Sequence, residues 1–171
     1  ESRVGDLPLP DPLRRLDGSR VEDAANWLEV RRPEILELFQ TNVYGRSPGK
    51  PPKLRFEPGS SEPALGGRAT RREVRIRFAE DPAGASMGLL LFVPADVPRP
   101  VPAFLGLNFR GNHAIHPDPG ITLSTSWMRE GPGVVDHRAT EATRGGAASR
   151  WPVEAIVSRG YALVTAYYGD I

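Results

Sequence analysis

The sequence contains no cysteine, no long apolar run and no excess of charge of one sign. The absence of cysteine excludes disulfides, thiol catalysis and cysteine-based zinc sites. No apolar run approaches the roughly 20 residues that a membrane helix needs, so we expect no membrane contact. The net charge is +1 and the arginines are spread along the chain, which gives no reason to expect a nucleic-acid partner.

Glycine and proline, by contrast, are frequent. Each occurs 18 times among the 171 residues, which predicts long, turn-rich loops around the core of a single domain, residues 1–171. Residues 1–18 are predicted to form an extended arm, because proline disfavours helix in the residue before it. Neither an initiator methionine nor a signal peptide is visible at Glu1. We therefore expect a processed or trimmed chain, which is compatible with a removed signal peptide.

Two helices are predicted before residue 46. Ser19 and Glu22 have the spacing of a capping box, which predicts a helix that begins near Arg20. Pro33 suits the first turn of a second helix, and Gly45 suits its end. Residues 46–68 are rich in proline, glycine and serine and are predicted to form a surface connection.

The second half of the sequence has strand patterns. Apolar residues alternate with charged ones at 73–78 and recur at 87–93, which predicts an antiparallel hairpin. Two short apolar runs, 103–107 and 162–166, are typical of parallel strands that are buried on both faces. A helix that begins near Trp151 and ends at Gly160 is predicted between them. Residues 110–148 lack periodicity and form an unusually long loop, of a kind that is often functional.

This order of elements is how the α/β-hydrolase fold begins. We therefore predict the N-terminal portion of a three-layer α/β-hydrolase fold, in which a hairpin leads into parallel strands with helices. The strand at 162–166 needs cover that the predicted elements do not supply.

Ligands of open α/β sheets bind beyond the carboxyl ends of the strands. The residues at these ends are therefore our candidates for a pocket wall, and the 110–148 loop lies on the same side. The alternative is a structural turn in which the polar side chains are satisfied locally, with Arg110 in a surface ion pair. The candidates are Asn108, Phe109, Arg110, Gly111, Asn112, His113, Tyr168 and Asp170.

Two further patterns resemble catalytic or metal sites. Gly84, Ser86 and Gly88 fit the G-x-S-x-G pattern of a nucleophile elbow, but Ser86 enters a strand instead of a helix, so we interpret it as a strand residue. All three histidines lie in the long loop, and with Asp118 and Asp136 they have the residue types of a metal site. A proline-flanked loop does not impose ligand geometry, so we expect no metal and no cofactor. Asp136 and His137 lack a credible serine partner for a triad.

The chain resembles the N-terminal half of the bacterial glucuronoyl esterases. The resemblance lies in residues 7–12, 32–39, 43–46, 107–113, 149–152, 160–162 and 167–171.

The resemblance implies a serine-type carbohydrate esterase with an α/β-hydrolase fold, no metal and a secreted or periplasmic location. Such an enzyme cleaves the ester that links 4-O-methyl-glucuronic acid on xylan to a lignin alcohol. It implies also that the nucleophile, the acid and the catalytic histidine follow Ile171, in the C-terminal half of the same protein, and that no catalytic residue lies in this chain. We therefore expect the chain alone to be inactive.

Two alternatives remain open at this point. The first is another carbohydrate esterase of the same fold, such as an acetyl-xylan esterase. The second is a non-catalytic carbohydrate-binding module.

Overall fold

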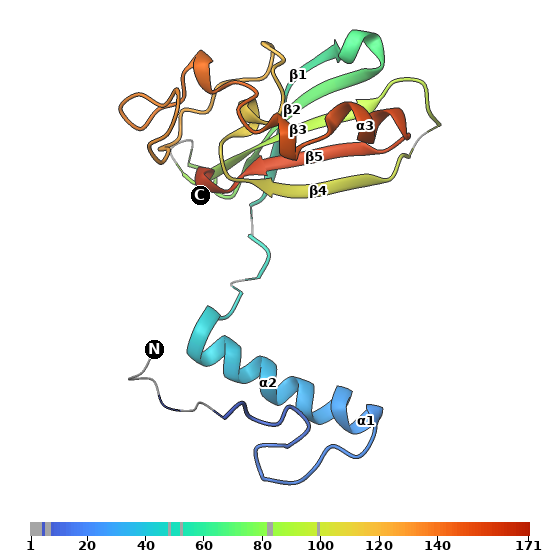
Figure 1. The fold of residues 1–171 in the computed structure, drawn as a ribbon, viewed down its shortest axis with the longest axis vertical. Helices are drawn as coiled ribbons and strands as arrows, with labels where there is room; N and C mark the ends of the chain where they lie inside the picture. Colours follow the sequence, from blue (N-terminus) through green and yellow to red (C-terminus); the bar gives the residue numbers. More distant parts are fainter. Residues whose placement is uncertain (1–4, 6–7, 48, 52, 82–83, 99) are drawn as a thin grey trace. The chain divides into compact units, whose positions relative to one another are not determined.

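The computed structural model describes residues 5, 8–47, 49–51, 53–81, 84–98 and 100–171 (Figure 1). The chain divides into two compact units, residues 1–49 and residues 50–171. Each unit is described by itself. Among the helices that the structure describes, none combines the length and apolar character that a membrane crossing requires.

The first unit is built around one helical run. It comprises α1 (Ala24–Asn26), a π-helical turn (Trp27–Arg31), α2 (Arg32–Phe39) and a second π-helical turn (Gln40–Tyr44). The Asp23 carboxylate caps this run by accepting from the Asn26 N–H at 2.7 Å. The predicted start near Arg20 was therefore wrong, because Asp23 and not Ser19 supplies the N-terminal oxygen. The part of the predicted arm at residues 1–4 and 6–7 lies outside the described residues.

Pro33 lies inside this run instead of starting a separate helix. Proline has no N–H and its ring clashes with the carbonyl four residues earlier. The π-helical turn just before Pro33 widens the helix there, with the Arg32 N–H donating to the Trp27 carbonyl five residues back. The prediction of two helices was wrong for this reason. Gly45, at φ 76°, ends the run as predicted.

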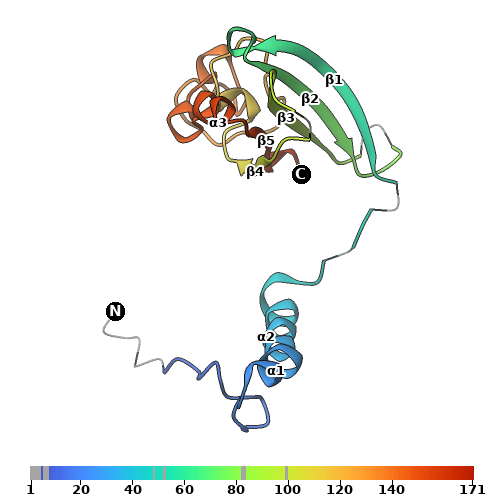
Figure 2. The same ribbon diagram turned by 90° about the vertical axis from the view of Figure 1, so that its right-hand side faces the viewer.

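The second unit is a five-stranded sheet in the order β1-β2-β3-β5-β4 (Figures 1 and 2). The strands are β1 (Arg55–Ala64), β2 (Ala69–Arg77), β3 (Ser86–Pro94), β4 (Ala103–Asn108) and β5 (Ala162–Tyr167). The predicted hairpin is confirmed as β2 and β3, and β4 runs parallel to β5. The predicted helix is α3 (Val153–Ser158), which follows Pro152 and is followed by Gly160 at φ 81°.

Strand β1 corrects the prediction of a surface connection over residues 46–68. It pairs antiparallel with β2, and its register shifts between Pro58 and Ser61. Proline and glycine are rare inside strands, so a segment rich in them is predicted as a loop. Both residues are tolerated at a bulge on an edge strand, which is the position of β1.

Strand β4 corrects a second prediction. Residues 103–107 were expected to be buried on both faces, but the side chains of Phe104, Leu105 and Leu107 are exposed. The reason is the place of β4 at the end of the strand order, where its only partner among the described residues is β5. Strand β5 lies between β3 and β4, and five of its six residues are buried, as predicted.

The core lies between the sheet, α3 and the loop of residues 110–148. Figure 2 shows this loop and α3 on the same side of the sheet. The loop supplies Ile115 and Ile121 to a cluster that also contains Leu90, Phe92 and Val153. The loop is thus part of the core despite its lack of periodicity. Its regular structure consists of short 3-10 turns at Asn112–Ala114, Glu141–Thr143 and Ala148–Arg150.

Candidate active-site wall

Phe109 and Tyr168 follow β4 and β5 directly. Because these two strands are parallel, their carboxyl ends lie at one edge of the sheet. The two rings meet there with centroids 5.1 Å apart and an interplanar angle of 54°. Both side chains are exposed, so the pair presents an aromatic surface to solvent.

A hollow of about 780 Å³, which we call the first hollow, opens beside this pair. Phe109 and Arg110 line it from the end of β4, Tyr168 lines it from the end of β5, and Met128 and its neighbours line it from the long loop. The volume lies within the range of about 300–1,000 Å³ typical of small-molecule sites. Among the described residues, no hydrogen bond or ion pair holds the Arg110 side chain, and Arg110 shares the lining of the hollow with Glu130.

The structure places three other predicted residues in a different arrangement, around the backbone of Gly88 in β3. The Asp170 carboxylate accepts from the Gly88 N–H at 2.9 Å, and the Asn112 amide donates to the Gly88 carbonyl at 2.8 Å. The Asn108 amide donates to the Asn112 side-chain oxygen at 2.7 Å and to the Thr165 hydroxyl at 3.1 Å. The register of β3 with β5 runs from Leu89 to Phe92, so these side chains pair the peptide groups just beyond it.

This arrangement holds the turns after β4 and β5 at a fixed spacing. Asp170 also accepts from the Ser126 hydroxyl at 2.8 Å, which ties the long loop to the same point. Asn108, Asn112 and Asp170 therefore position the wall of the first hollow, whose lining residues come from their neighbours. Whether they also touch a substrate stays a prediction.

His113 lies behind the wall and is fully buried. Its Nδ1 accepts from the Ser124 N–H at 3.4 Å, and its Nε2 lies 2.8 Å from the Thr143 hydroxyl. Burial, assisted by the positive charge of Arg144, lowers the pKa of His113 from 6.5 to about 4. The ring is therefore neutral at pH 7, and Nε2 donates to the Thr143 hydroxyl, which itself donates to the Thr140 carbonyl. Gly111, at φ 87°, leaves room for this ring because a Cβ there would come within 2.4 Å of it.

The other two histidines, His116 and His137, have different partners from His113 and from each other. His116 Nε2 lies 3.1 Å from the Glu154 carboxylate, and His116 Nδ1 accepts from the Asp118 N–H at 3.1 Å. His137 stacks on Trp127, with centroids 4.9 Å apart, and its Nδ1 lies 3.1 Å from the Met128 carbonyl. In the part of the chain that the structure describes, no group of three or more acidic or histidine side chains has the geometry of a metal site.

Ser86 opens β3, and its hydroxyl lies 3.3 Å from the Arg75 guanidinium. A nucleophile elbow requires a strand before the serine and a helix after it, whereas a strand follows here. The interpretation of Ser86 as a strand residue is confirmed.

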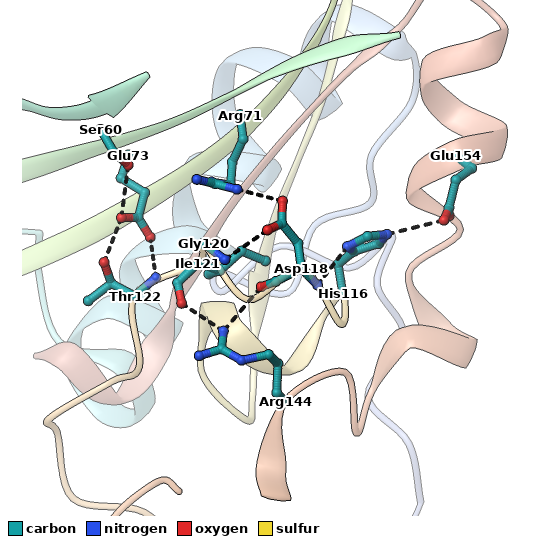
Figure 3. Close-up of polar contacts among 10 residues, drawn as sticks. All are labelled: Ser60, Arg71, Glu73, His116, Asp118, Gly120, Ile121, Thr122, Arg144 and Glu154. Atoms are coloured by element: carbon teal, nitrogen blue, oxygen red, sulfur yellow. Dashed lines mark hydrogen bonds and ion pairs between the residues drawn. The ribbon is translucent and has the colours of Figure 1, made fainter. Parts of the chain in front are cut away.

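A polar network that the sequence did not reveal fixes the long loop to the sheet (Figure 3). Arg71 of β2 is buried and donates to the Asp118 carboxylate at 2.6 Å. Glu73 accepts from both the N–H and the hydroxyl of Thr122, at 2.9 and 2.6 Å. Arg144 donates to the Ile121 carbonyl at 2.7 Å. The alternation of charged and apolar residues predicted β2 correctly. Its charged face was expected to be open to solvent, but Arg71 and Glu73 on this face contact the loop.

The Arg71 contact depends on Gly120, because a Cβ at this position would lie 2.2 Å from the guanidinium. Burial alone raises the pKa of Asp118, but the hydrogen bond from the Gly120 N–H and the Arg71 guanidinium outweigh this effect and lower it. Asp118 is thus ionised at neutral pH and holds its partner as a charged pair.

Comparison with known proteins connects this geometry to a family. No protein-family model matches the chain. The carbohydrate esterase MZ0003, from an unidentified prokaryote, is 43% identical over 173 residues, which are 100% of this chain and 40% of the relative. A promiscuous CE15 esterase from a marine bacterial metagenome has a TM-score of 0.86 at 43% identity, over 99% of this chain and 43% of that one. A glucuronoyl esterase from Solibacter usitatus has a TM-score of 0.86 at 44% identity, over 100% and 43%.

The resemblance to the glucuronoyl esterases is confirmed. The α/β-hydrolase fold class is confirmed by the same structures. The chain spans about two fifths of the length of these relatives, which is consistent with the predicted N-terminal half. The relatives are carboxylic ester hydrolases.

Proposed function

We propose that this chain supplies one wall of the active site of a serine esterase that cleaves glucuronoyl esters between glucuronoxylan and lignin alcohols. The observation that carries the proposal is the first hollow, with the Phe109–Tyr168 pair and Arg110 at the carboxyl ends of two parallel strands. Its support is the homology to glucuronoyl esterases over the whole chain.

Ester cleavage needs an activated nucleophile, a base that takes its proton and donors for the developing oxyanion. Ser86 lies in a strand, and each histidine of this chain is already engaged elsewhere. We therefore assign the nucleophile and its base to the C-terminal half of the same protein. This half is the principal partner of the chain in the proposal.

The wall can contribute binding and orientation. The aromatic pair offers an apolar surface of the kind that packs against a sugar face or an aromatic alcohol. The Arg110 guanidinium can donate to the oxygen atoms of the uronoyl group, since it carries donors in a planar fork. A polymeric plant substrate lies outside the cell, so the proposal includes export of the protein.

The test is hydrolysis by the full-length protein. Benzyl glucuronate and acetylated xylan are offered in parallel, and the release of benzyl alcohol and of acetate is measured. The proposal predicts alcohol release, lost when an active-site serine is labelled by a fluorophosphonate. Acetate release alone would replace the proposal with an acetyl-xylan esterase. Absence of both activities, with binding to xylan retained, would indicate a carbohydrate-binding module.

A further inference from the structure

The first unit has no buried apolar core of its own. In the described part of residues 1–49, the only buried residue is Arg31, which donates to the Glu34 carboxylate and to the Pro12 carbonyl, each at 3.1 Å. These contacts fasten the segment around Pro12 to the helical run of residues 24–44. Folded units owe most of their stability to buried apolar surface, so a unit of this size without a core needs cover from another body.

One face of this helical run is apolar and open. Leu36, Phe39 and Val43 follow one another at the spacing of three and four residues that places side chains on one side of a helix. The Tyr44 ring stacks on the Phe39 ring, with centroids 6.0 Å apart and an interplanar angle of 24°. These four side chains, which we call the apolar stripe, are between 42% and 81% exposed. Large apolar side chains gathered on one face are typical of a surface that binds another body.

The polar side chains beside the stripe, by contrast, have partners within the first unit. The Thr41 hydroxyl donates to the Glu37 carboxylate at 3.0 Å. Arg46 forms an ion pair with the same carboxylate and donates to the Gln40 side-chain oxygen at 3.2 Å. The polar side therefore holds the end of the helical run, and the apolar stripe takes no part in this network.

The relatives described above contain the first unit together with a body that this chain lacks. They match 99–100% of this chain, but only 40–43% of their own length lies in the match. More than half of each relative therefore lies outside the matched part. Residues 50–171, in comparison, form a compact unit that already has a core of its own. The C-terminal half is thus the largest source of surface for covering the stripe.

We propose that the apolar stripe docks on an apolar surface of the C-terminal half of the same protein and there completes the core that the first unit lacks. The segment after Gly45 joins the first unit to β1, so this docking ties the C-terminal half to the unit that carries the candidate wall. The first unit thereby holds the two parts of the protein together. The inference depends on the chain being part of a longer protein and not on the reaction that this protein catalyses.

The test is photo-crosslinking of the full-length protein. The variant Phe39→p-benzoylphenylalanine places the crosslinker in the stripe. The control places it at Thr41, because residues two apart on a helix do not share a side. After irradiation, the crosslinked peptides are identified by mass spectrometry under denaturing conditions. We expect position 39 to crosslink within one molecule to peptides that follow Ile171, and position 41 to give no such crosslinks.

A matched pair of substitutions measures what the docking contributes. Leu36→Gln places an amide in the stripe, whereas Thr41→Gln changes the polar side, and glutamine suits a helix at both positions. Hydrogen exchange of the amides of residues 32–44 is followed in the full-length protein. We expect it to be faster by about tenfold or more in Leu36→Gln and to change by less than about twofold in Thr41→Gln, because helices in proteins are stabilised mainly by packing of the apolar face.

Four results would overturn the inference. Crosslinks from position 39 to residues 50–171 would place the stripe on the second unit, and crosslinks between two molecules would place it on a second copy. Absence of crosslinks from position 39, or equal exchange in Leu36→Gln and Thr41→Gln, would mean that the stripe stays open to solvent. Because neither measurement uses an ester, these results are independent of the hydrolysis that tests the proposed function.

Discussion

Strand β4 and the loop of residues 110–148 differ in burial in the opposite sense to what their sequences suggest. The strand is a short apolar run, yet Leu105 is 75% exposed. The loop has no periodicity and many glycines, prolines and arginines, yet its Ile121 is 1% exposed and its Ile115 is fully buried. Burial therefore depends on what an element packs against in the fold, and hydropathy within the element is a weaker guide.

The largest expected effect comes from the charged pair that holds the loop to the sheet. Arg71→Ala leaves the Asp118 carboxylate without its cation, and we expect the free energy of unfolding to fall by about 3–5 kcal/mol. Urea denaturation of the full-length protein measures this loss. Arg72→Ala, at the exposed neighbouring position, is the control and should change it by less than about 0.5 kcal/mol. Equal effects of the two variants would show that the loop is not held by this pair.

Deletion of an apolar side chain in the loop should cost nearly as much. Ile121→Ala opens a cavity in the core, and we expect a loss of about 2–4 kcal/mol in the free energy of unfolding. The same urea titration measures it. A loss below about 1 kcal/mol would mean that the loop packs loosely and that its burial does not stabilise the fold.

Acid should loosen the loop through His113. The pKa of this ring is lowered to about 4 in the folded protein, so folding disfavours its protonation. This ring takes nothing from the free energy of unfolding above pH 6.5. As the pH falls from 6.5 toward 4, the unfolded chain binds a proton that the folded protein excludes, and the free energy of unfolding falls by about 3 kcal/mol in total. Unfolding curves recorded between pH 7 and 4 measure the slope.

A histidine variant assigns this acid sensitivity. His113→Gln should flatten the slope between pH 6.5 and 4. An unchanged slope in His113→Gln would assign the acid sensitivity to other groups.

The smallest expected effect is in β4. Leu105→Ala removes a side chain that is exposed in the structure of residues 1–171, and we expect a cost below about 1 kcal/mol in this chain. Urea denaturation of residues 1–171 compares this variant with Ile121→Ala. A cost above about 2 kcal/mol would contradict the exposed position of Leu105 in this chain.

Local patterns predicted the elements whose contacts are local or periodic. The β2–β3 hairpin, the termination of α3 just before Gly160 and the burial of β5 all follow from alternation, turn residues and apolar runs. Strand β1 was missed because Pro58 and Pro63 fit only a bulged edge strand, which a local pattern does not reveal. The covered polar face of β2 was missed because Arg71 and Asp118 meet across 47 residues of sequence.

The candidate site was predicted in part. Phe109, Arg110 and Tyr168 lie together in the first hollow, since the ends of two parallel strands meet at one sheet edge. The roles of Asn108, Asn112 and Asp170 in pairing Gly88 could not be predicted, because they depend on where the pairing of β3 with β5 stops. The burial of His113 depends likewise on Thr143, which lies 30 residues later.

Two aromatic pairs at opposite ends of β4 allow the central proposal to be tested most directly. In the first hollow, the ring centroids of Phe109 and Tyr168 lie 5.1 Å apart. Outside this hollow, the ring centroids of Phe104 and Tyr161 lie 5.3 Å apart. The measurement is kcat/KM of the full-length protein on benzyl glucuronate for Phe109→Ala and Phe104→Ala. The account predicts a loss of about tenfold or more for Phe109→Ala and less than about twofold for Phe104→Ala. Equal values for the two variants, both folded, would contradict the assignment of this wall to the active site.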